Sequence, residues 1–217
     1  MSKDVTETLQ NLRRRYTQSS FDLQDCSQSP SEQMSHWLQD AISGQCDEPN
    51  AFILSTCRDG KPRARVVLLK GLENGKLYFY TNYRSSKGDE IGKNDSVAMT
   101  FLWLPLQRQV RIEGKVSLTT PQESDEYFHK RPRGSQLGAI ASPQSSRVAK
   151  RSELEKLFQD AEEKYKGQEE LPRPPHWGGY IVTPDYFEFW QGRDNRMHDR
   201  ISYQKIKDGW EMFRLAP

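Results

Sequence analysis

Short apolar runs separated by turn dipeptides constrain the fold of this chain more than any other feature. From Ala51 onward such runs are divided by Asp59-Gly60, Asn74-Gly75 and Asp208-Gly209. Asp-Gly and Asn-Gly readily adopt the positive φ angles of tight hairpin turns, so each pair predicts two antiparallel strands. The predicted strands cover residues 51–57, 63–69, 76–81, 97–103, 109–118, 179–182, 186–191, 200–203 and 210–215. Because strands do not alternate with helices, the pattern favours a barrel or sandwich over a doubly wound sheet.

Helical patterns surround these strands. Residues 31–43 carry apolar side chains at helical spacing, residues 121–129 begin with proline and acidic residues, and residues 152–166 form the clearest amphipathic pattern. Residues 85–92 predict a short helix or a turn. The first thirty residues are polar and rich in Ser and Gln, so we expect residues 1–30 to be a mobile arm and residues 31–217 to form one domain.

Composition narrows the classes of function. Thirty-two Lys and Arg residues nearly balance 30 Asp and Glu residues, so no overall field points to nucleic acid or to a membrane surface. Cys26, Cys46 and Cys57 are odd in number and far apart, which predicts free thiols in a reducing cytoplasm. No apolar run approaches the roughly 20 residues of a transmembrane helix. We therefore expect a cytoplasmic protein in which any anion site is local.

The run EFWQGRDNRMHDR, residues 188–200, carries the strongest candidate site. Arg196, His198 and Arg200 occur at every second position after an aromatic strand end. If this segment is extended, all three side chains lie on one face and form a wall suited to an anionic, planar ligand. A solvated edge strand would give the same alternation. The aromatic pair and the turn at Gly192 favour the ligand wall.

Other polar side chains gather at the ends of predicted elements. Arg65 and Lys70 flank an apolar strand centre at an odd spacing, which places them on opposite faces unless the strand is bulged. A strand ends at residues 80–82 just before a helix opens at residues 85–87, where backbone N–H groups and a lysine suit a phosphate. Further clusters occupy residues 107–111, 127–135 and 144–147. Motifs for metal hydrolysis, thiol redox, acyl transfer and P-loop chemistry do not occur in the sequence, so we expect no metal.

Together these motifs resemble the pyridoxamine (pyridoxine) 5′-phosphate oxidase family. The matching segments are RVVLLK at residues 65–70, FYTN at 79–82, RQVRIEG at 108–114, YFHKRPRGSQLGA at 127–139, SPQSS at 142–146, WGGY at 177–180, FWQG with RMHDR, and the terminal RLAP. They follow the family's order from about Arg13 to Pro217. The resemblance implies a mainly β, antiparallel, Greek-key-like split barrel with peripheral helices. It also implies a homodimer with FMN bound at the subunit interface.

The resemblance also implies roles for individual residues. The implied FMN contacts are Arg65, Val66, Val67, Leu68, Leu69, Lys70, Tyr80, Thr81, Ser86, Lys87, Gln109, Gln144, Ser145, Trp190 and Arg200. The implied substrate contacts are Lys70, Tyr127, Arg131, Ser135, Arg196, His198, Arg13, Arg14, Arg15 and Tyr16. Arg196 and His198 are the implied catalytic pair above the pyridine ring. Family members usually have Ser-Arg-Lys at residues 85–87, so Ser86 replaces an arginine at the FMN phosphate.

The activity implied is oxidation of pyridoxamine 5′-phosphate or pyridoxine 5′-phosphate to pyridoxal 5′-phosphate, with O₂ as electron acceptor. Two other interpretations remain. Split barrels also serve as other flavin reductases and as binding proteins for flavin or haem, although the complete set of substrate-side residues argues against a protein that only binds. A nucleic-acid module built on Arg13, Arg14 and Arg15 is disfavoured, because the overall charge is balanced.

Overall fold

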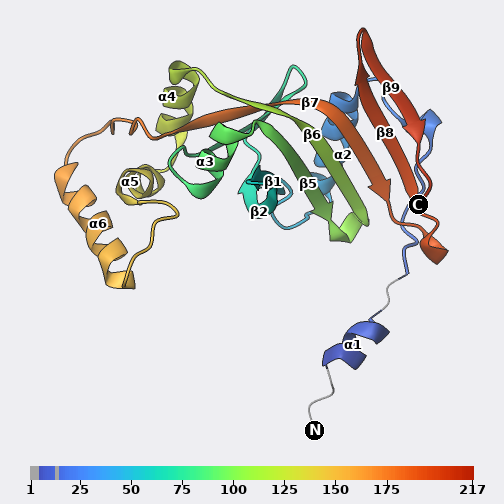
Figure 1. The fold of residues 1–217 in the computed structure, drawn as a ribbon, viewed down its shortest axis with the longest axis horizontal. Coiled ribbons are helices and arrows are strands. Elements are labelled where there is room, and N and C mark those ends of the chain that lie inside the picture. Colours follow the sequence, from blue (N-terminus) through green and yellow to red (C-terminus); the bar gives the residue numbers. More distant parts are fainter. Residues whose placement is uncertain (1–4, 13–14) are drawn as a thin grey trace.

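The computed structural model describes residues 5–12 and 15–217, and within them the chain forms an antiparallel β-sheet with helices at its edges (Figure 1). The strands are β1 (Ala51–Arg58), β2 (Lys61–Leu68), β3 (Gly71–Glu73), β4 (Lys76–Asn82), β5 (Ser96–Trp103), β6 (Arg108–Leu118), β7 (Trp177–Gln191), β8 (Asp199–Ile206) and β9 (Gly209–Arg214). Their order is β2-β1-β5-β6-β7-β4-β3, and β8 and β9 continue from β7. Among the described residues, β2 and β3 do not pair with each other, so the barrel is split.

The described helices are α1 (Val5–Asn11), α2 (Pro30–Ser43), α3 (Ser86–Lys93), α4 (Pro121–Lys130), α5 (Arg133–Ala141) and α6 (Arg151–Lys164). Short 3-10 turns occur at η1 (Leu23–Asp25), η2 (Leu104–Leu106) and η3 (Asp194–Arg196). The predicted helices at residues 31–43, 85–92, 121–129 and 152–166 are therefore confirmed within a few residues. In the part of the chain that the structure describes, no helix is both long and apolar enough to cross a membrane.

All the predicted strands form, but two of them are parts of a single long strand. Residues 179–182 and 186–191 belong to β7, which runs from α4 at one end of the molecule to β8 at the other (Figure 1). The β6–β7 register shifts between Glu113 and Gly114, and this bulge lets the ladder continue past Pro184. A Cβ at Gly114 would overlap the carbonyl oxygen of Thr183, so only glycine fits there.

Local signals explain two helix starts that position the site. Ser85 accepts a hydrogen bond from the Gly88 N–H and caps α3, while Thr120 and Glu123 form a capping box in front of α4. Helix α5 was not predicted. It follows a proline and contains Gly134 and Gly138, which are poor helix formers, so its propensity is weak.

The buried side chains form two hydrophobic clusters. The larger one joins residues of α2 and of most of the strands and is rich in aromatic rings. The smaller one consists of Phe128, Leu137, Ala161, Leu171 and Trp177, and it holds α4, α5 and α6 against the start of β7. This second cluster supplies the tertiary packing that compensates for the weak propensity of α5.

The N-terminal thirty residues divide into two parts. Helix α1 is exposed along its whole length. In contrast, Phe21 is only 5% exposed, and its ring centroid lies 4.8 Å from that of Trp37. The Phe21 N–H donates to Asp199 and the Tyr203 hydroxyl donates to the Ser27 carbonyl, so the chain is anchored to the body from Phe21 onward. Mobility of the preceding arm stays a prediction.

Replacing Phe21 tests this anchor. We expect Phe21→Ala to lower the free energy of unfolding by about 3–5 kcal/mol, because a buried ring is removed from the core. The matched control is Leu23→Ala, whose side chain lies in the same segment and is 38% exposed; it should cost about 1 kcal/mol or less. Urea unfolding curves measure both values, and equal small losses would contradict the anchor.

Candidate active site

Helix α3 brings a lysine to its own N-terminus. Lys87 Nζ donates to Thr81 Oγ1 at 3.2 Å, to Ser85 Oγ at 3.3 Å and to Gln144 Oε1 at 2.9 Å. Burial lowers the pKa of Lys87, and the positive charge of Arg65 lowers it further, whereas Glu90 opposes both effects. An ammonium group beside the free N–H groups of a helix start forms a strong site for a phosphate.

A buried carboxylate fixes Arg65 next to this site. Arg65 Nη2 donates to Glu90 Oε2 at 2.6 Å, and Arg65 Nη1 donates to Thr56 Oγ1 at 2.6 Å. The Glu90 side chain is 3% exposed. Burial raises the pKa of Glu90, but hydrogen bonds from Thr56 and Arg65 outweigh it and hold the pKa below its usual value. Arg65 is therefore oriented by three elements, β1, β2 and α3.

Stacked aromatic rings line a second pocket near α4. The rings of Tyr80 and Tyr127 are stacked with centroids 3.8 Å apart, and Trp177 lies parallel to both. The Arg131 guanidinium lies 4.5 Å from the centroid of the Trp177 ring. Lys70 lies with both tyrosines in the wall of a cavity of about 190 Å³.

Arg131 has a donor without a partner. Its Nη1 is buried and makes no hydrogen bond to any described residue. Burial lowers the pKa of Arg131, although nearby Tyr127 opposes this. Leaving a buried charged donor unpaired costs free energy, so the geometry fits an anion that is not part of the chain. Ser135 lies in the first turn of α5, four residues after Arg131.

The other predicted FMN contacts of this region lie on β2 and around α3. Val66 is 65% exposed on β2, Val67 and Leu68 are half-buried, and Leu69 is buried just after the strand. Ser86 is the exposed first residue of α3. Gln144 reaches Lys87, and the exposed Ser145 follows it with a φ of 71°. We call the residues Arg65–Lys70, Tyr80, Thr81, Ser86, Lys87, Tyr127, Arg131, Ser135, Gln144 and Ser145 the α3–α5 group.

The remaining predicted residues gather at the far end of β7. Trp190 pairs with Gln109 on β6 and with Arg200 on β8. Arg200 Nε donates to Glu188 Oε1 at 2.9 Å, and its Nη1 donates to the Ala216 carbonyl at 2.8 Å. We call Gln109, Trp190, Arg196, His198 and Arg200 the β6–β8 group.

His198 is held against Trp190. The two ring centroids are 4.6 Å apart, and the edge of Tyr16 meets both rings. The Arg193 N–H donates to His198 Nδ1 at 3.1 Å, so the neutral imidazole carries its proton on Nε2. Burial lowers the pKa of His198 and the positive charge of Arg196 lowers it further, whereas Asp199 opposes them.

The predicted wall of three alternating side chains is wrong. Asn195 and Arg196 have φ angles of 55° and 62°, and β8 begins only at Asp199. These left-handed residues turn the chain, so a period of two does not apply before the strand. Arg200 lies in β8 and is paired with Glu188.

The N-terminal residues lie beside this loop. Leu12, Arg15, Tyr16, Arg196 and His198 line a cavity of about 710 Å³. Arg15 Nη2 donates to Asp194 Oδ2 at 2.7 Å, and the Arg15 side chain is 85% exposed. The predicted substrate contacts Arg13 and Arg14 lie outside the described residues.

The α3–α5 group and the β6–β8 group lie at opposite ends of β7. Thr81 pairs with Gly178 and Gln109 pairs with Trp190. At about 3.3 Å per residue, the strand between these two rungs has a contour length of about 40 Å. Figure 1 shows β7 running from the end of the sheet near α4 to the end near β8. One protomer therefore does not bring all the predicted site residues together.

Sequence reasoning missed the acidic partners of the arginines. Glu188 is 3% exposed and accepts hydrogen bonds from Arg111 at 3.0 Å as well as from Arg200. Its signal in the sequence is a lone acid that precedes an aromatic strand end, in a position where an apolar residue is expected. Glu90 has no such signal, since it lies among other charged residues on the short helix α3.

Comparison with known proteins identifies the family. A family model described as pyridoxamine 5′-phosphate oxidase matches residues 38–166, and one described as pyridoxine 5′-phosphate oxidase C-terminal dimerisation region matches residues 177–217. The chain is 47% identical over 212 residues to pyridoxine/pyridoxamine 5′-phosphate oxidase of Salinibacter ruber, covering 96% of this chain and 99% of that protein. It is 45% identical over 218 residues to the protein of the same name from Rubrobacter xylanophilus, covering 100% of both.

Solved structures agree with this result. PhzG from Burkholderia lata, in complex with tetrahydrophenazine-1-carboxylic acid, superposes with a TM-score of 0.85 at 26% identity and covers 92% of this chain and 100% of PhzG. An FMN-binding protein from Nostoc punctiforme shares the fold, with a TM-score of 0.71 at 17% identity, covering 85% of this chain and 95% of that one. The fold is a split β-barrel. More narrowly, the chain belongs to the pyridoxamine 5′-phosphate oxidase family.

The pairing of Glu90 with Arg65 predicts a pH-dependent contribution to stability. Because the folded-state pKa is lowered, the pair stabilises the protein above the usual glutamate pKa, and this stability is lost as the pH falls through the folded-state value. We expect Glu90→Gln to lower the free energy of unfolding by about 2 kcal/mol at pH 7, and by progressively less in acid.

Urea unfolding at several pH values measures this difference. The matched control is Glu113→Gln, because Glu113 pairs with Arg111 but is 46% exposed; it should cost less than about 1 kcal/mol at every pH. A loss for Glu90→Gln that is the same in acid as at neutral pH would contradict the assigned charge state.

Proposed function

We propose that this chain is an FMN-dependent oxidase that converts pyridoxamine 5′-phosphate and pyridoxine 5′-phosphate to pyridoxal 5′-phosphate. The amine substrate reacts with O₂ and water to give pyridoxal 5′-phosphate, ammonia and hydrogen peroxide. The alcohol substrate reacts with O₂ to give pyridoxal 5′-phosphate and hydrogen peroxide. A cytoplasmic location is part of the proposal, supported by Cys26, Cys46 and Cys57, which are all free thiols.

The observation that carries the proposal is the unpartnered Nη1 of Arg131 beside stacked aromatic rings. A buried guanidinium donor with no partner suits a phosphate dianion, and Tyr127 lies within reach of the same site. Lys70 and Ser135 complete the proposed grip on the substrate phosphate. The relatives with 45–47% identity are named for activity on such substrates, which supports the same conclusion.

The residues around α3 fit the phosphate of FMN. Lys87, Thr81 and the N–H groups at the start of α3 converge there, and Glu90 holds Arg65 alongside. When bound, FMN accepts the two electrons and the hydrogen removed from the substrate and passes them to O₂. The task of the chain is to hold two planar rings in register, which is catalysis by orientation.

His198 and Arg196 act on the substrate ring in this proposal. Because His198 Nδ1 already accepts the Arg193 N–H, the neutral imidazole presents its Nε2–H to the ligand. His198 therefore serves as a hydrogen-bond donor to a ring oxygen in this orientation, rather than as the proton acceptor. The fixed charge of Arg196 assists by stabilising negative charge on the same ring oxygen.

We also propose that FMN binds between two copies of the chain. The α3–α5 group of one protomer and the β6–β8 group of its partner together make one site, since the contour of β7 keeps them apart within a protomer. The match to a dimerisation region at residues 177–217 supports this arrangement. Val66 and Ile53, which are neighbours on β2 and β1, are 65% and 39% exposed and offer an apolar face for the partner.

An aerobic assay tests the activity. Purified protein with added FMN is incubated with pyridoxamine 5′-phosphate, and formation of pyridoxal 5′-phosphate and hydrogen peroxide is followed. Equal amounts of both products are expected. If FMN binds and neither product appears, the oxidase proposal fails, and a protein that only binds flavin is the interpretation that remains.

Mixing two inactive variants tests the shared site. Arg131→Gln should abolish substrate binding, and Arg196→Leu should lower turnover strongly while FMN stays bound. Unfolding and refolding an equal mixture should restore about a quarter of the wild-type activity, because half of the dimers are mixed and each carries one intact site. No recovery, with mixed dimers shown to form by mass spectrometry, would place both residues in the site of a single protomer.

Ser86 predicts weakened FMN affinity. Ser86→Arg should strengthen binding by about 1.5–3 kcal/mol through a charge-assisted hydrogen bond to the FMN phosphate. Quenching of flavin fluorescence gives the dissociation constant. Ser35→Arg adds the same charge on the exposed face of α2 and should leave the affinity unchanged. If Ser86→Arg leaves the FMN affinity unchanged, as this control does, Ser86 does not weaken the binding of the FMN phosphate.

A further inference from the structure

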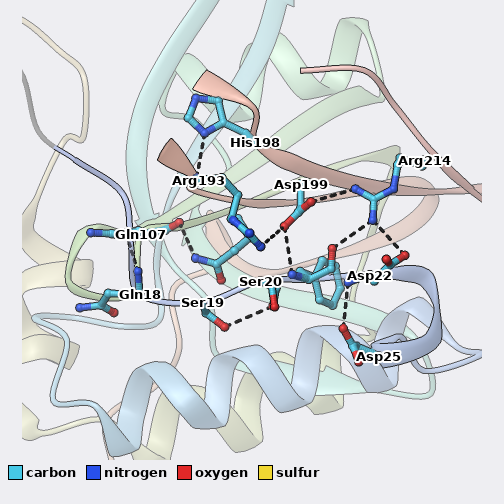
Figure 2. A network of polar contacts seen from close by, with 12 residues as sticks. Gln18, Ser19, Ser20, Asp22, Asp25, Gln107, Arg193, His198, Asp199 and Arg214 are labelled. Carbon is cyan, nitrogen blue, oxygen red and sulfur yellow. Dashed lines mark hydrogen bonds and ion pairs between the residues drawn. The ribbon is translucent and has the colours of Figure 1, made fainter. Parts of the chain in front are cut away.

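The loop that carries Arg196 and His198 adopts a strained backbone. Asn195 and Arg196 both have positive φ, a conformation that residues with a side chain rarely adopt because it costs free energy. Such a backbone persists only when its surroundings fix it. Figure 2 shows the polar network beneath the loop, with Asp199 at its centre.

Asp199 joins three segments that are distant in the sequence. Its Oδ2 accepts the Phe21 N–H at 3.1 Å and Arg193 Nη1 at 3.1 Å, while its Oδ1 accepts Arg214 Nη1 at 2.9 Å (Figure 2). The side chain is 17% exposed. The N-terminal segment, the loop and the last strand are thus tied to one carboxylate.

Arg193 links the two ends of the loop through both its backbone N–H and its side chain. Its backbone N–H donates to His198 Nδ1, and its side chain donates to Asp199, the residue after His198. These two links join Arg193, near the start of the loop, to His198 at its end and to Asp199, the first residue of β8. Without the carboxylate, the Arg193 side chain would lose this anchor, and its N–H would no longer be aimed at the imidazole.

We propose that Asp199 is a positioning residue for the oxidation, because it fixes Arg193 and through it the orientation and tautomer of the His198 imidazole. The inference rests on the proposed function, in which His198 and Arg196 lie over the substrate. Asp199 itself touches neither the substrate nor the cofactor in this arrangement.

The negative charge of Asp199 also affects the pKa of the His198 imidazole. The titratable and charged groups near the His198 ring are Tyr16 and Arg15 from the N-terminal segment, and Arg193, Asp194, Arg196 and Asp199 from the loop and β8. Of these, Asp199 favours the imidazolium and Arg196 disfavours it. Removing the Asp199 charge should therefore lower the pKa of His198 further.

Nuclear magnetic resonance of the FMN-loaded protein with ¹⁵N-labelled histidine tests the positioning directly. The chain has four histidines, and His198→Gln assigns the signal of interest. In the wild type we expect the neutral ring to carry its proton on Nε2. In Asp199→Asn we expect a mixture of tautomers and a lower pKa. Arg193→Gln, which removes the exposed end of the ion pair, should reproduce the tautomer mixture and serves if Asp199→Asn folds poorly.

Kinetics supply the second measurement. Asp199→Asn should lower kcat by roughly tenfold with little change in KM or in FMN affinity, because orientation and not binding is lost. The acid limb of the pH profile of kcat for Asp199→Asn should move to lower pH together with the pKa of His198. The matched control is Asp22→Asn, since Asp22 pairs with Arg214 in the same network, is 59% exposed and does not contact the loop. This control should leave both measurements unchanged.

The outcomes separate this inference from the proposed function. If the wild type does not oxidise pyridoxamine 5′-phosphate, the proposed function fails, and with it the role of Asp199 in that reaction, whatever the histidine signals show. If the wild type is active and Asp199→Asn leaves the tautomer and the pKa of His198 unchanged, the positioning role is overturned. A changed imidazole with an unchanged kcat would also overturn it.

Discussion

Strand β7 pairs with β6 along one edge from Tyr180 to Gln191, while its other edge pairs first with β4 and then with β8. This change of partner places the end of β4 and the loop before β8 at opposite ends of one strand. The first half of β7 places the end of β4 beside α3 and α4, and the second half carries Trp190 and the loop to β8. The bulge opposite Glu113 and Gly114 lets a single strand serve both purposes, because it leaves Asp185 of β7 without a partner and the ladder continues through Pro184.

Three arginines in or beside the candidate site are paired in advance with carboxylates, whereas Arg131 is not. Glu90 orients Arg65, Glu188 orients Arg200 and Asp199 orients Arg193. A fixed guanidinium loses little side-chain entropy when an anion binds. The carboxylates therefore neutralise part of the positive charge of the site, but they hold each guanidinium group in a defined position. Arg131 is the exception, since one of its donors is buried and unpaired. At that donor, an anion from outside the chain would contribute most to the stability of the site, because it would supply the missing hydrogen-bond acceptor.

The sequence predicted the parts of this structure that depend on local chemistry. Asp59-Gly60 and Asn74-Gly75 located hairpins because positive φ is a property of the turn itself, and Pro121 located a helix start for a similar reason. The same reasoning from local sequence patterns gave a wrong prediction for the loop before β8. Its alternation imitates a strand, but Asn195 and Arg196 are left-handed, and the contacts around the loop, such as those of Asp199 with Phe21 and Arg214, leave no local pattern. The carboxylate partners were missed for the same reason.

The two separated groups have a consequence for how the protein responds to its cofactor. On the proposed arrangement FMN touches both chains, so it binds the dimer and has no complete site on a free protomer. Linkage then requires that the cofactor tighten subunit association by the same factor by which association tightens the cofactor. With the weaker phosphate contact predicted for Ser86, dilution of the protein and depletion of flavin would reinforce each other. The amount of assembled protein would follow the supply of FMN.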